Sequence, residues 1–421
     1  MTEFIERARA ILRDNDLGGY TVPTKRLYPF QWNWDSGFAA LGFSTFDEPR
    51  AWQELDMLFR GQWEDGLVPH IVFHKVSPDY FPGPGLWGVD RKPQTSGITQ
   101  PPVVASIVRR LLEDARDRSL AEARAKTLYP KLLAYHRWWW RARDPENTGL
   151  AVIYHPWESG MDNSPAWDAA LARVPQTENR DYVRRDTSHV DSAQRPRQAE
   201  YDRYMYLVEL FRGQSYDPAF MYRESPFRVA DLCVNSALQR ATEDLAFLTE
   251  RFGTADERRE IADRIALGRK GFDRLWSDED GRYYNLDTRG AGLVRIGTSA
   301  GFMPLYAGAP DRERADRMAS DLGRWGEAVA FLVPSTDPAA AVFERQRYWR
   351  GPVWFVVNYM IAEGLLRYGH ADLAERIRRD TARLIETKGF YEYFDPIDGT
   401  GYGGGHFTWT AAMYLHWAGR P

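Results

Sequence analysis

The stretch VASIVRRLL at residues 104–112 shows the pattern that decides the fold. Its apolar side chains are spaced i, i+3, i+4, i+7 and i+8, at Val104, Ile107, Val108, Leu111 and Leu112. This spacing places them on one face of an α-helix. The stretch therefore predicts an amphipathic helix that buries one side against other helices.

Helical patterns continue on both sides of this stretch. They predict helices over residues 2–14, 50–61, 119–143, 197–213, 228–252, 255–276, 311–322, 350–369, 371–387 and 407–418. A further helix is expected after the aromatic segment 28–38, with Asp35 or Ser36 as its cap. Strand signals are few and short, so the sequence predicts an all-α protein with about a dozen helices.

The loops between these helices alternate in length. Long loops rich in aromatic residues begin near positions 30, 74, 144, 277, 331 and 389, whereas connections such as 253–254 and 368–370 are short. Helical hairpins that close into a ring place the short turns at one end and the long loops at the other. No linker-like change of composition divides the chain. We therefore expect one domain over residues 1–421, with loops near 74–99 and 172–192 as lids.

Composition excludes several classes of function. The net charge of −4 gives no basic surface for nucleic acid or for an anionic membrane. A single cysteine, Cys233, rules out an intramolecular disulfide and a cysteine-based zinc site, and the eight histidines show no metal-ligand spacing. We expect no metal and no cofactor. The N-terminus lacks a secretory signal, and no apolar run reaches about 20 residues. These features predict a cytoplasmic protein without membrane contact. Whether the chain forms a homo-oligomer stays open.

Residues 155–168 combine carboxylates with indole rings in one short loop. Trp157 and Trp167 flank Glu158 and Asp162. A carboxyl group beside an indole keeps its proton to higher pH, because the apolar surroundings disfavour the charged form. A glycosidase makes its general acid in this way. We select Asp162 as that acid; the alternative interpretation is a turn or helix cap before a proline.

Hydrolysis of a glycosidic bond with inversion also needs an ionised carboxylate, about 6.5–9.5 Å from the acid, to activate water. Glu392 is the best candidate, because it lies between two tyrosines and precedes the glycine-rich segment 399–405. The alternative interpretation is an exposed loop glutamate. The two acids are far apart in the sequence, so spacing alone does not show that they meet.

Four segments together resemble those of trehalases and of glycoside hydrolase family 63. Residues 157–164 resemble the Glu-Ser-Gly-x-Asp segment that carries the general acid, and residues 392–394 resemble the segment of the base. Residues 348–354 resemble the Tyr-Trp-Arg-Gly-x-x-Trp signature, and residues 229–235 resemble an Asp-x-x-x-Asn helix. The resemblance covers nearly the whole chain, from about residue 28 to 410.

Within that family, residues 31–36 and 192–204 resemble the mannosylglycerate and glucosylglycerate hydrolases. The resemblance implies an (α/α)6 toroid whose long loops form the active-site face. It implies that a small glycoside, 2-O-α-mannosyl-D-glycerate or its glucosyl analogue, is hydrolysed with inversion. Asp162 would be the general acid and Glu392 the general base. The implied substrate contacts are Trp34, Asp35, Gln100, Tyr348 and Trp349 at the sugar, Arg195 and Tyr201 at the glycerate, and Tyr28 and Tyr80 over the substrate.

Side-chain chemistry supports part of this assignment. A glycerate carboxylate fits a guanidinium, whose planar fork donates two parallel hydrogen bonds. Arg195, Arg197 and Arg350 are candidates, and a surface arginine is the alternative interpretation of Arg195. Trp34 and Trp349 offer flat faces on which a sugar can stack.

Three other functions remain as alternatives. A trehalase or an oligosaccharide α-glucosidase belongs to the same class of enzyme. A sugar epimerase on a similar toroid would use histidines as acid and base, whereas the acids stand out in this chain. A non-catalytic sugar-binding protein would not need the two carboxylates.

Overall fold

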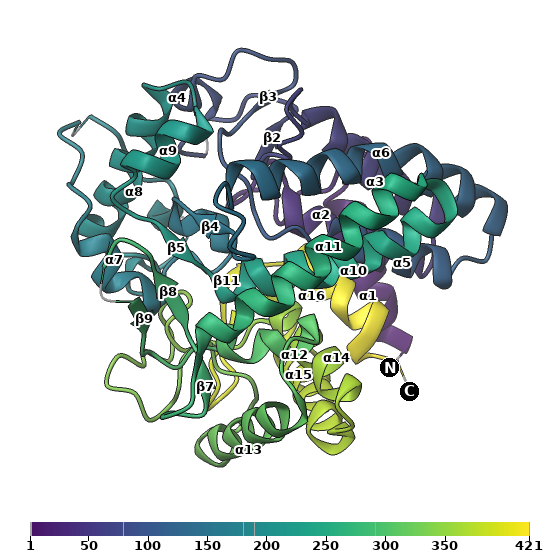
Figure 1. Ribbon diagram of the computed structural model, residues 1–421. Coiled ribbons are helices and arrows are strands. Elements are labelled where there is room, and N and C mark those ends of the chain that lie inside the picture. Colours follow the sequence, from purple (N-terminus) through teal and green to yellow (C-terminus); the bar gives the residue numbers. More distant parts are fainter. Residues whose placement is uncertain (1, 79, 180, 189, 291, 421) are drawn as a thin grey trace.

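The computed structural model describes residues 2–78, 80–179, 181–188, 190–290 and 292–420. Twelve of its helices alternate along the chain between an inner and an outer layer (Figure 1). The inner helices are α2 (Asn33–Ser44), α5 (Val104–Glu113), α10 (Leu232–Phe252), α12 (Met303–Ala307), α14 (Phe355–Arg367) and α16 (Thr408–Met413). The outer helices are α1 (Thr2–Asp14), α3 (Glu48–Leu58), α6 (Arg118–Ala142), α11 (Ala255–Phe272), α13 (Arg312–Ala328) and α15 (Ala371–Lys388).

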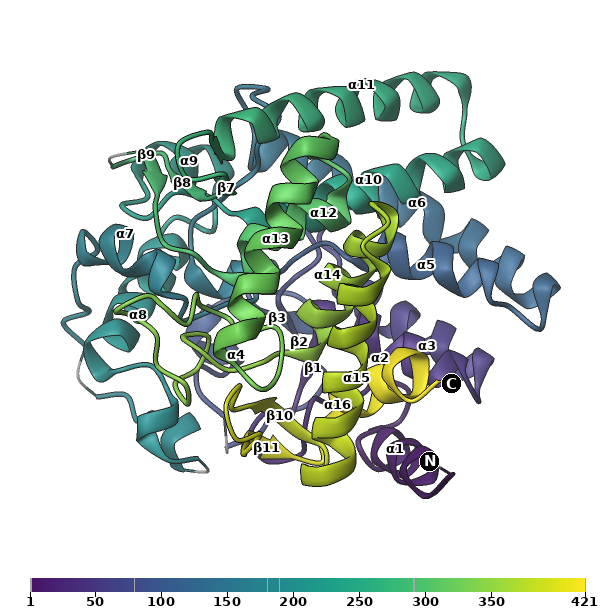
Figure 2. The same cartoon turned by 90° about the horizontal axis from the view of Figure 1, so that it is seen from below.

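The inner helices form a closed ring. Each contacts the next, in the order α2, α5, α10, α12, α14 and α16, and α16 returns to α2. Outer helices α1, α3, α6, α11 and α15 pack against this ring, as Figure 2 shows from below. The fold is the (α/α)6 toroid that the sequence predicted, and the all-α prediction is confirmed.

The remaining elements lie in the long loops. Four further α-helices belong to them, the short α4 (Pro84–Trp87), α7 (Asp168–Ala172) and α9 (Pro218–Glu224) and the longer α8 (Gln198–Arg212). One small sheet has the order β1 (Gln31–Trp32), β2 (Ile71–Phe73), β3 (Gln94–Thr95), and another has the order β4 (Val152–Ile153), β5 (Val229–Ala230), β8 (Asn285–Asp287), β9 (Gly292–Val294). Two hairpins pair β6 (Trp276–Ser277) with β7 (Arg282–Tyr283) and β10 (Tyr391–Phe394) with β11 (Gly401–Gly405). All these strand pairs are antiparallel.

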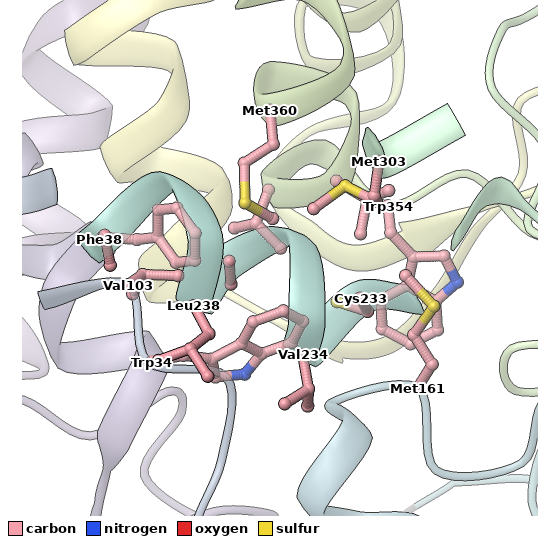
Figure 3. Packing of buried hydrophobic residues seen from close by; sticks show 14 of the residues in the cluster. Trp34, Phe38, Val103, Met161, Cys233, Val234, Leu238, Met303, Trp354 and Met360 are labelled. Atoms are coloured by element: carbon pink, nitrogen blue, oxygen red, sulfur yellow. The ribbon is translucent and has the colours of Figure 1, made fainter. Parts of the chain in front are cut away.

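Helix α2 shows why an inner helix is hard to see in a sequence. Every residue from Asn33 to Phe43 is buried. A helix that is enclosed on all sides lacks the polar face that gives helical periodicity. Figure 3 shows Trp34 and Phe38 of this helix among apolar side chains of α10 and α14 in the middle of the ring.

Some helix bounds differ from the sequence predictions: α10 begins at Leu232 rather than at residue 228, and α13 continues to Ala328 rather than ending at residue 322. Two further differences lie close to the site. Asp35 and Ser36 do not cap α2, because the helix begins at Asn33 with Trp32 as its N-cap and both residues lie in the first turn. Helix α14 begins at Phe355 rather than at residue 350, because Pro352 disfavours helical backbone at the residue before it and Val353 pairs with the backbone of Phe394. The change at α2 matters for the site, since it turns Asp35 inward.

In the part of the chain that the structure describes, no helix combines the length and the apolar character needed to cross a membrane.

Candidate active site

A cavity with an empty volume of about 780 Å³ lies where the long loops meet the inner helices. Its walls come from the first turn of α2, from the segments before α5 and α14, and from the start of α16. Ten of the eleven residues predicted for the site line it: Tyr28, Trp34, Asp35, Tyr80, Gln100, Asp162, Arg195, Tyr201, Tyr348 and Glu392. The ring therefore brings together residues from both ends of the chain.

Asp162 is held by a tight loop that follows β4. Met161 packs into the core beside Cys233 and Trp354 (Figure 3), and the indole N–H of Trp167 donates to the Met161 carbonyl at 2.8 Å. The neighbouring Asp162 is thereby turned toward the cavity. A Cβ atom at Gly160 would lie 2.7 Å from the indole of Trp34, so only glycine lets this loop approach the ring.

The surroundings of Asp162 favour its protonated form. Burial, reinforced by the charge of Glu392, raises the pKa of this carboxyl to about 7, whereas Arg195 and its own backbone N–H act to lower it. Asp162 is therefore about half protonated near pH 7, where an ordinary aspartate is ionised. A carboxyl group in this state can donate that proton to a leaving oxygen.

Glu392 lies on β10 and is 1% exposed. Its Oε1 accepts hydrogen bonds from the hydroxyls of Tyr28 at 3.1 Å and Tyr348 at 3.0 Å. A Cβ atom at Gly403, on the facing strand, would lie 2.2 Å from Oε2, and Gly403 has a φ of 71°. The hairpin therefore requires glycine here to enclose the carboxylate.

Asp35, Asp162 and Glu392 lie in the same cavity, and the charge of Glu392 raises the pKa of the other two. Burial raises the pKa of Glu392, and Arg195 and the two tyrosine hydroxyls oppose that rise. Burial also raises the pKa of Asp35 well above its usual range, with further contributions from Glu392 and Asp162. Arg195 is the cation that offsets this accumulation of acids.

Of the three candidate arginines, Arg195 is the one that lines the cavity. Its guanidinium lies 4.2 Å from the centre of the Tyr348 ring and is buried. Arg197 is 60% exposed and pairs with Glu344, and the buried Arg350 pairs with Asp168. The surface interpretation of Arg195 is therefore wrong.

Comparison with known proteins identifies the group to which this chain belongs. The model of the mannosylglycerate hydrolase MGH1-like glycoside hydrolase domain matches residues 28–410. The chain belongs to this glycoside hydrolase family. It is 54% identical to mannosylglycerate hydrolase MGH1 of Selaginella moellendorffii, over 98% of this chain and 85% of that protein. It is 36% identical to the glucosylglycerate hydrolase of Mycolicibacterium hassiacum, over 99% and 98% of the two chains.

Among solved structures of the family, the crystal structure of the GH63 mannosylglycerate hydrolase from Thermus thermophilus, in complex with Tris and D-glycerate, has a TM-score of 0.96 to this chain. The two are 51% identical, and the match covers 98% of this chain and 99% of that one. The resemblance to family 63 that the motifs predicted is confirmed, and the chain is a glycoside hydrolase.

Trp349 is the predicted site residue that the structure places apart from the other members of this glycoside hydrolase site. It does not line the cavity formed by the described residues. Its indole stacks on Trp354, with ring centres 3.8 Å apart and an angle of 4° between the planes. Trp349 also has a φ of 58°, which is unusual for a residue other than glycine. In this arrangement it lies behind Trp34, with ring centres 6.4 Å apart.

Glu158, the other acid of the 155–168 loop, is fully buried and does not line the cavity. One carboxylate oxygen lies 2.5 Å from the Arg143 guanidinium, and the backbone N–H of Tyr154 donates to the other at 2.8 Å. The N–H of Thr99 also donates to this carboxylate, at 3.3 Å. Glu158 therefore ties the acid loop to the segment that precedes α5, and leaves the cavity to Asp162.

Several residues of this family member line the cavity without having been singled out as substrate contacts. They include Trp32, His70, Phe81, Asp186 and Trp409. Trp32 and Trp409 carry an aromatic signal in the sequence, since Trp32 stands within the aromatic segment 28–38 and Trp409 follows the glycine-rich turn closely. Asp186 carries no such signal, because it stands in a polar loop with several other charged residues.

The cavity offers carboxylates, phenols and a guanidinium to a ligand. Among the described residues, no three or more His, Cys, Asp or Glu side chains are grouped closely enough to hold a metal ion. The residues present are those of acid–base chemistry.

Proposed function

We propose that this enzyme hydrolyses 2-O-α-mannosyl-D-glycerate to mannose and glycerate, with inversion at the anomeric carbon. The observation that carries the proposal is the position of Arg195 beside Asp162 and Glu392 in one cavity. A guanidinium next to the acid pair fits an aglycone with a carboxylate. The similarity to mannosylglycerate hydrolases at 54% identity, and to a relative crystallised with D-glycerate, supports the same substrate.

The reaction follows from the two protonation states. Asp162 gives its proton to the glycosidic oxygen as the bond from that oxygen to the anomeric carbon breaks, and glycerate leaves. Glu392 takes a proton from the water that forms the new bond to the anomeric carbon on the opposite face. Tyr28 and Tyr348 hold Glu392 by its Oε1, so the carboxylate keeps its orientation while it accepts the proton.

The remaining contacts divide between the two parts of the substrate. We assign Trp34, Asp35 and Gln100 to the sugar, because they come from the ring close to Asp162 and Glu392. Gln100 is fixed by the backbone N–H of Trp34, which donates to its Oε1 at 3.4 Å. Tyr348 lies under Arg195, so it contacts both parts. Trp349 supports Trp34 from behind in this assignment.

Tyr80 and Tyr201 belong to the roof of the cavity, where the predicted lid loops 74–99 and 172–192 meet. Phe81 stacks on Tyr182 with ring centres 5.1 Å apart, and the Tyr201 hydroxyl donates to the Phe81 carbonyl at 3.1 Å. We propose that these loops cover the substrate as lids. We also propose that residues 1–421 form one domain, since helices near both ends of the chain join the same ring.

The cytoplasmic location is a proposal as well. A small charged glycoside of this kind is a compatible solute, which serves its purpose inside the cell. The sequence left the possibility of a homo-oligomer open, and it stays open.

Three glycosides test the proposed substrate. Purified enzyme is expected to release glycerate from mannosylglycerate, and more slowly from glucosylglycerate, while trehalose stays intact, because trehalose has no carboxylate for Arg195. Chromatography of the released sugar measures the three rates. Turnover of trehalose without turnover of either glycosylglycerate would overturn the substrate and favour a trehalase.

The pH dependence is expected to be bell-shaped. Asp162 donates only while it is protonated, and its pKa is about 7, so kcat/KM should fall as the pH rises above about 7. Glu392 must be ionised, and burial raises its pKa above 4.5, so the acid limb should lie above that value. In the free enzyme, the positive charge of Arg195 lowers the pKa of Asp162. A substrate carboxylate bound to Arg195 offsets that charge, so the pKa of Asp162 should be higher in the complex. The alkaline limb of kcat should therefore lie at higher pH than that of kcat/KM. Initial rates across the range from acidic to mildly alkaline pH measure both limbs. An alkaline limb that persists in Asp162→Asn would assign it to another group.

A further inference from the structure

Asp186 places a carboxylate between two guanidinium groups at the wall of the cavity. The Nε and Nη2 of Arg184 donate to its two oxygens at 3.0 and 2.6 Å. The Nε of Arg195 donates to the Asp186 Oδ2 at 3.2 Å. The three side chains are only 8%, 12% and 7% exposed, in the order Arg184, Asp186, Arg195. Two positive charges and one negative charge therefore lie together, largely shielded from solvent.

The two arginines differ in the donors that remain to them. Arg184 uses Nε and Nη2 on Asp186, and its Nη1 donates to the Pro196 carbonyl at 2.8 Å. Arg195 uses its Nε on Asp186, but its Nη1 is buried and has no hydrogen-bond partner among the described residues. A buried donor without a partner is unfavourable, so this one calls for an acceptor from the ligand.

The charges explain why one donor stays free. If Asp186 had Arg195 as its single partner, the pair would be neutral and would leave little attraction for a second carboxylate. Arg184 supplies the additional positive charge and occupies both oxygens of Asp186. The cluster keeps one net positive charge. Its attraction for a ligand carboxylate is stronger in this shielded site than in water, because the effective dielectric constant is lower.

We propose that Asp186 is a positioning residue that holds Arg195 by its Nε edge and, together with Arg184, sets the aglycone subsite at one net positive charge. The enzyme thereby selects an aglycone with a single carboxylate over neutral and doubly charged ones. The inference rests on the proposed function, because it assumes that the aglycone carboxylate binds Arg195. Asp35, Asp162 and Glu392 also face the cavity, but they are common to all variants compared below.

Three compounds of nearly equal size test the charge selection. Glycerol, glycerate and tartronate share a three-carbon skeleton and carry no, one and two carboxylates. Their dissociation constants are measured by isothermal titration calorimetry, which does not depend on turnover. The intact enzyme is expected to bind glycerate most tightly. In Asp186→Asn, two unpaired guanidiniums remain, so binding of tartronate relative to glycerate should improve about tenfold, or about 1.4 kcal/mol.

Arg184→Gln is expected to act in the opposite direction. Asp186 is then paired with Arg195 alone, so glycerate and tartronate should both bind about tenfold more weakly. The double variant Arg184→Gln/Asp186→Asn restores one net positive charge, and the preference for glycerate should return. Because the two single variants move anion binding in opposite directions, general loss of folding cannot produce this result.

The matched control is Asp181→Asn, an exposed aspartate in the same segment, which should leave all three dissociation constants unchanged. Equal weakening of glycerate and tartronate in both single variants would overturn the proposal and leave Asp186 a structural role. Arg195→Ala separates this result from failure of the proposed function. If Arg195→Ala loses glycerate binding but Asp186→Asn keeps the selectivity of the intact enzyme, only the proposed role of Asp186 is refuted. Unchanged glycerate binding in Arg195→Ala refutes the carboxylate subsite itself.

Discussion

Replacing Asp162 by asparagine, or Glu392 by glutamine, should each lower kcat on mannosylglycerate by about 10²–10⁴-fold, the usual contribution of a positioned acid or base. Neither change alters side-chain size, so the cavity should keep its shape. The asparagine amide has no acidic proton for the leaving oxygen, and the glutamine amide cannot accept a proton from water. Steady-state kinetics measure the loss, and circular dichroism checks that both variants are folded.

A substrate with a leaving group that needs no proton distinguishes the two roles. On α-mannosyl fluoride, Asp162→Asn should regain most of its activity, whereas Glu392→Gln should stay inactive because water must still be activated. The exposed Glu178 provides a control, since Glu178→Gln should change neither rate. Equal losses in both variants on both substrates would contradict the assignment of acid and base.

Arg143→Met should lower the free energy of unfolding by about 3–5 kcal/mol, because removal of one partner leaves a buried charge uncompensated. Arg143 and Glu158 are 2% and 0% exposed, and the guanidinium lies 4.2 Å from the centre of the Tyr154 ring. The methionine keeps the apolar stem but not the charge. Urea unfolding measures the change.

Arg141→Met is the matched control, because Arg141 lies at an exposed position in the last turn of α6, the helix that Arg143 caps. It should shift the free energy of unfolding by less than about 0.5 kcal/mol. The double variant Arg143→Met/Glu158→Gln should recover part of the loss, since no unpaired charge remains. A change below about 1 kcal/mol in Arg143→Met would show that the pair contributes little.

The sequence predicted the outer helices and most of the inner ones, but it missed α12 and placed the start of α2 too late. Helix α15 has a clear apolar face, because one side meets the ring and the other meets solvent. Helix α2 is buried throughout and contains glycines and aromatic residues, so its pattern resembles a loop. The five-residue helix α12 is too short to show any periodicity.

The site residues follow a similar division. Asp162 and Glu392 stand out because each lies among aromatic residues, but their spacing in the sequence does not show that the ring brings them together. Trp349 matches a family signature, yet the stack with Trp354 keeps it out of the cavity. Asp186 could not be singled out, because it stands in a polar loop with several other charged residues and the sequence does not show that Arg195 donates to it.

Closure of the ring by α16 has a consequence for synthesis on the ribosome. Helix α16 begins roughly 360 residues after the end of α2, which at typical rates takes about 20–70 s to translate. During that interval the apolar faces of α1 and α2 have no α16 to cover them. The nascent chain should therefore bind a chaperone until its last helix emerges, and release should coincide with the onset of activity.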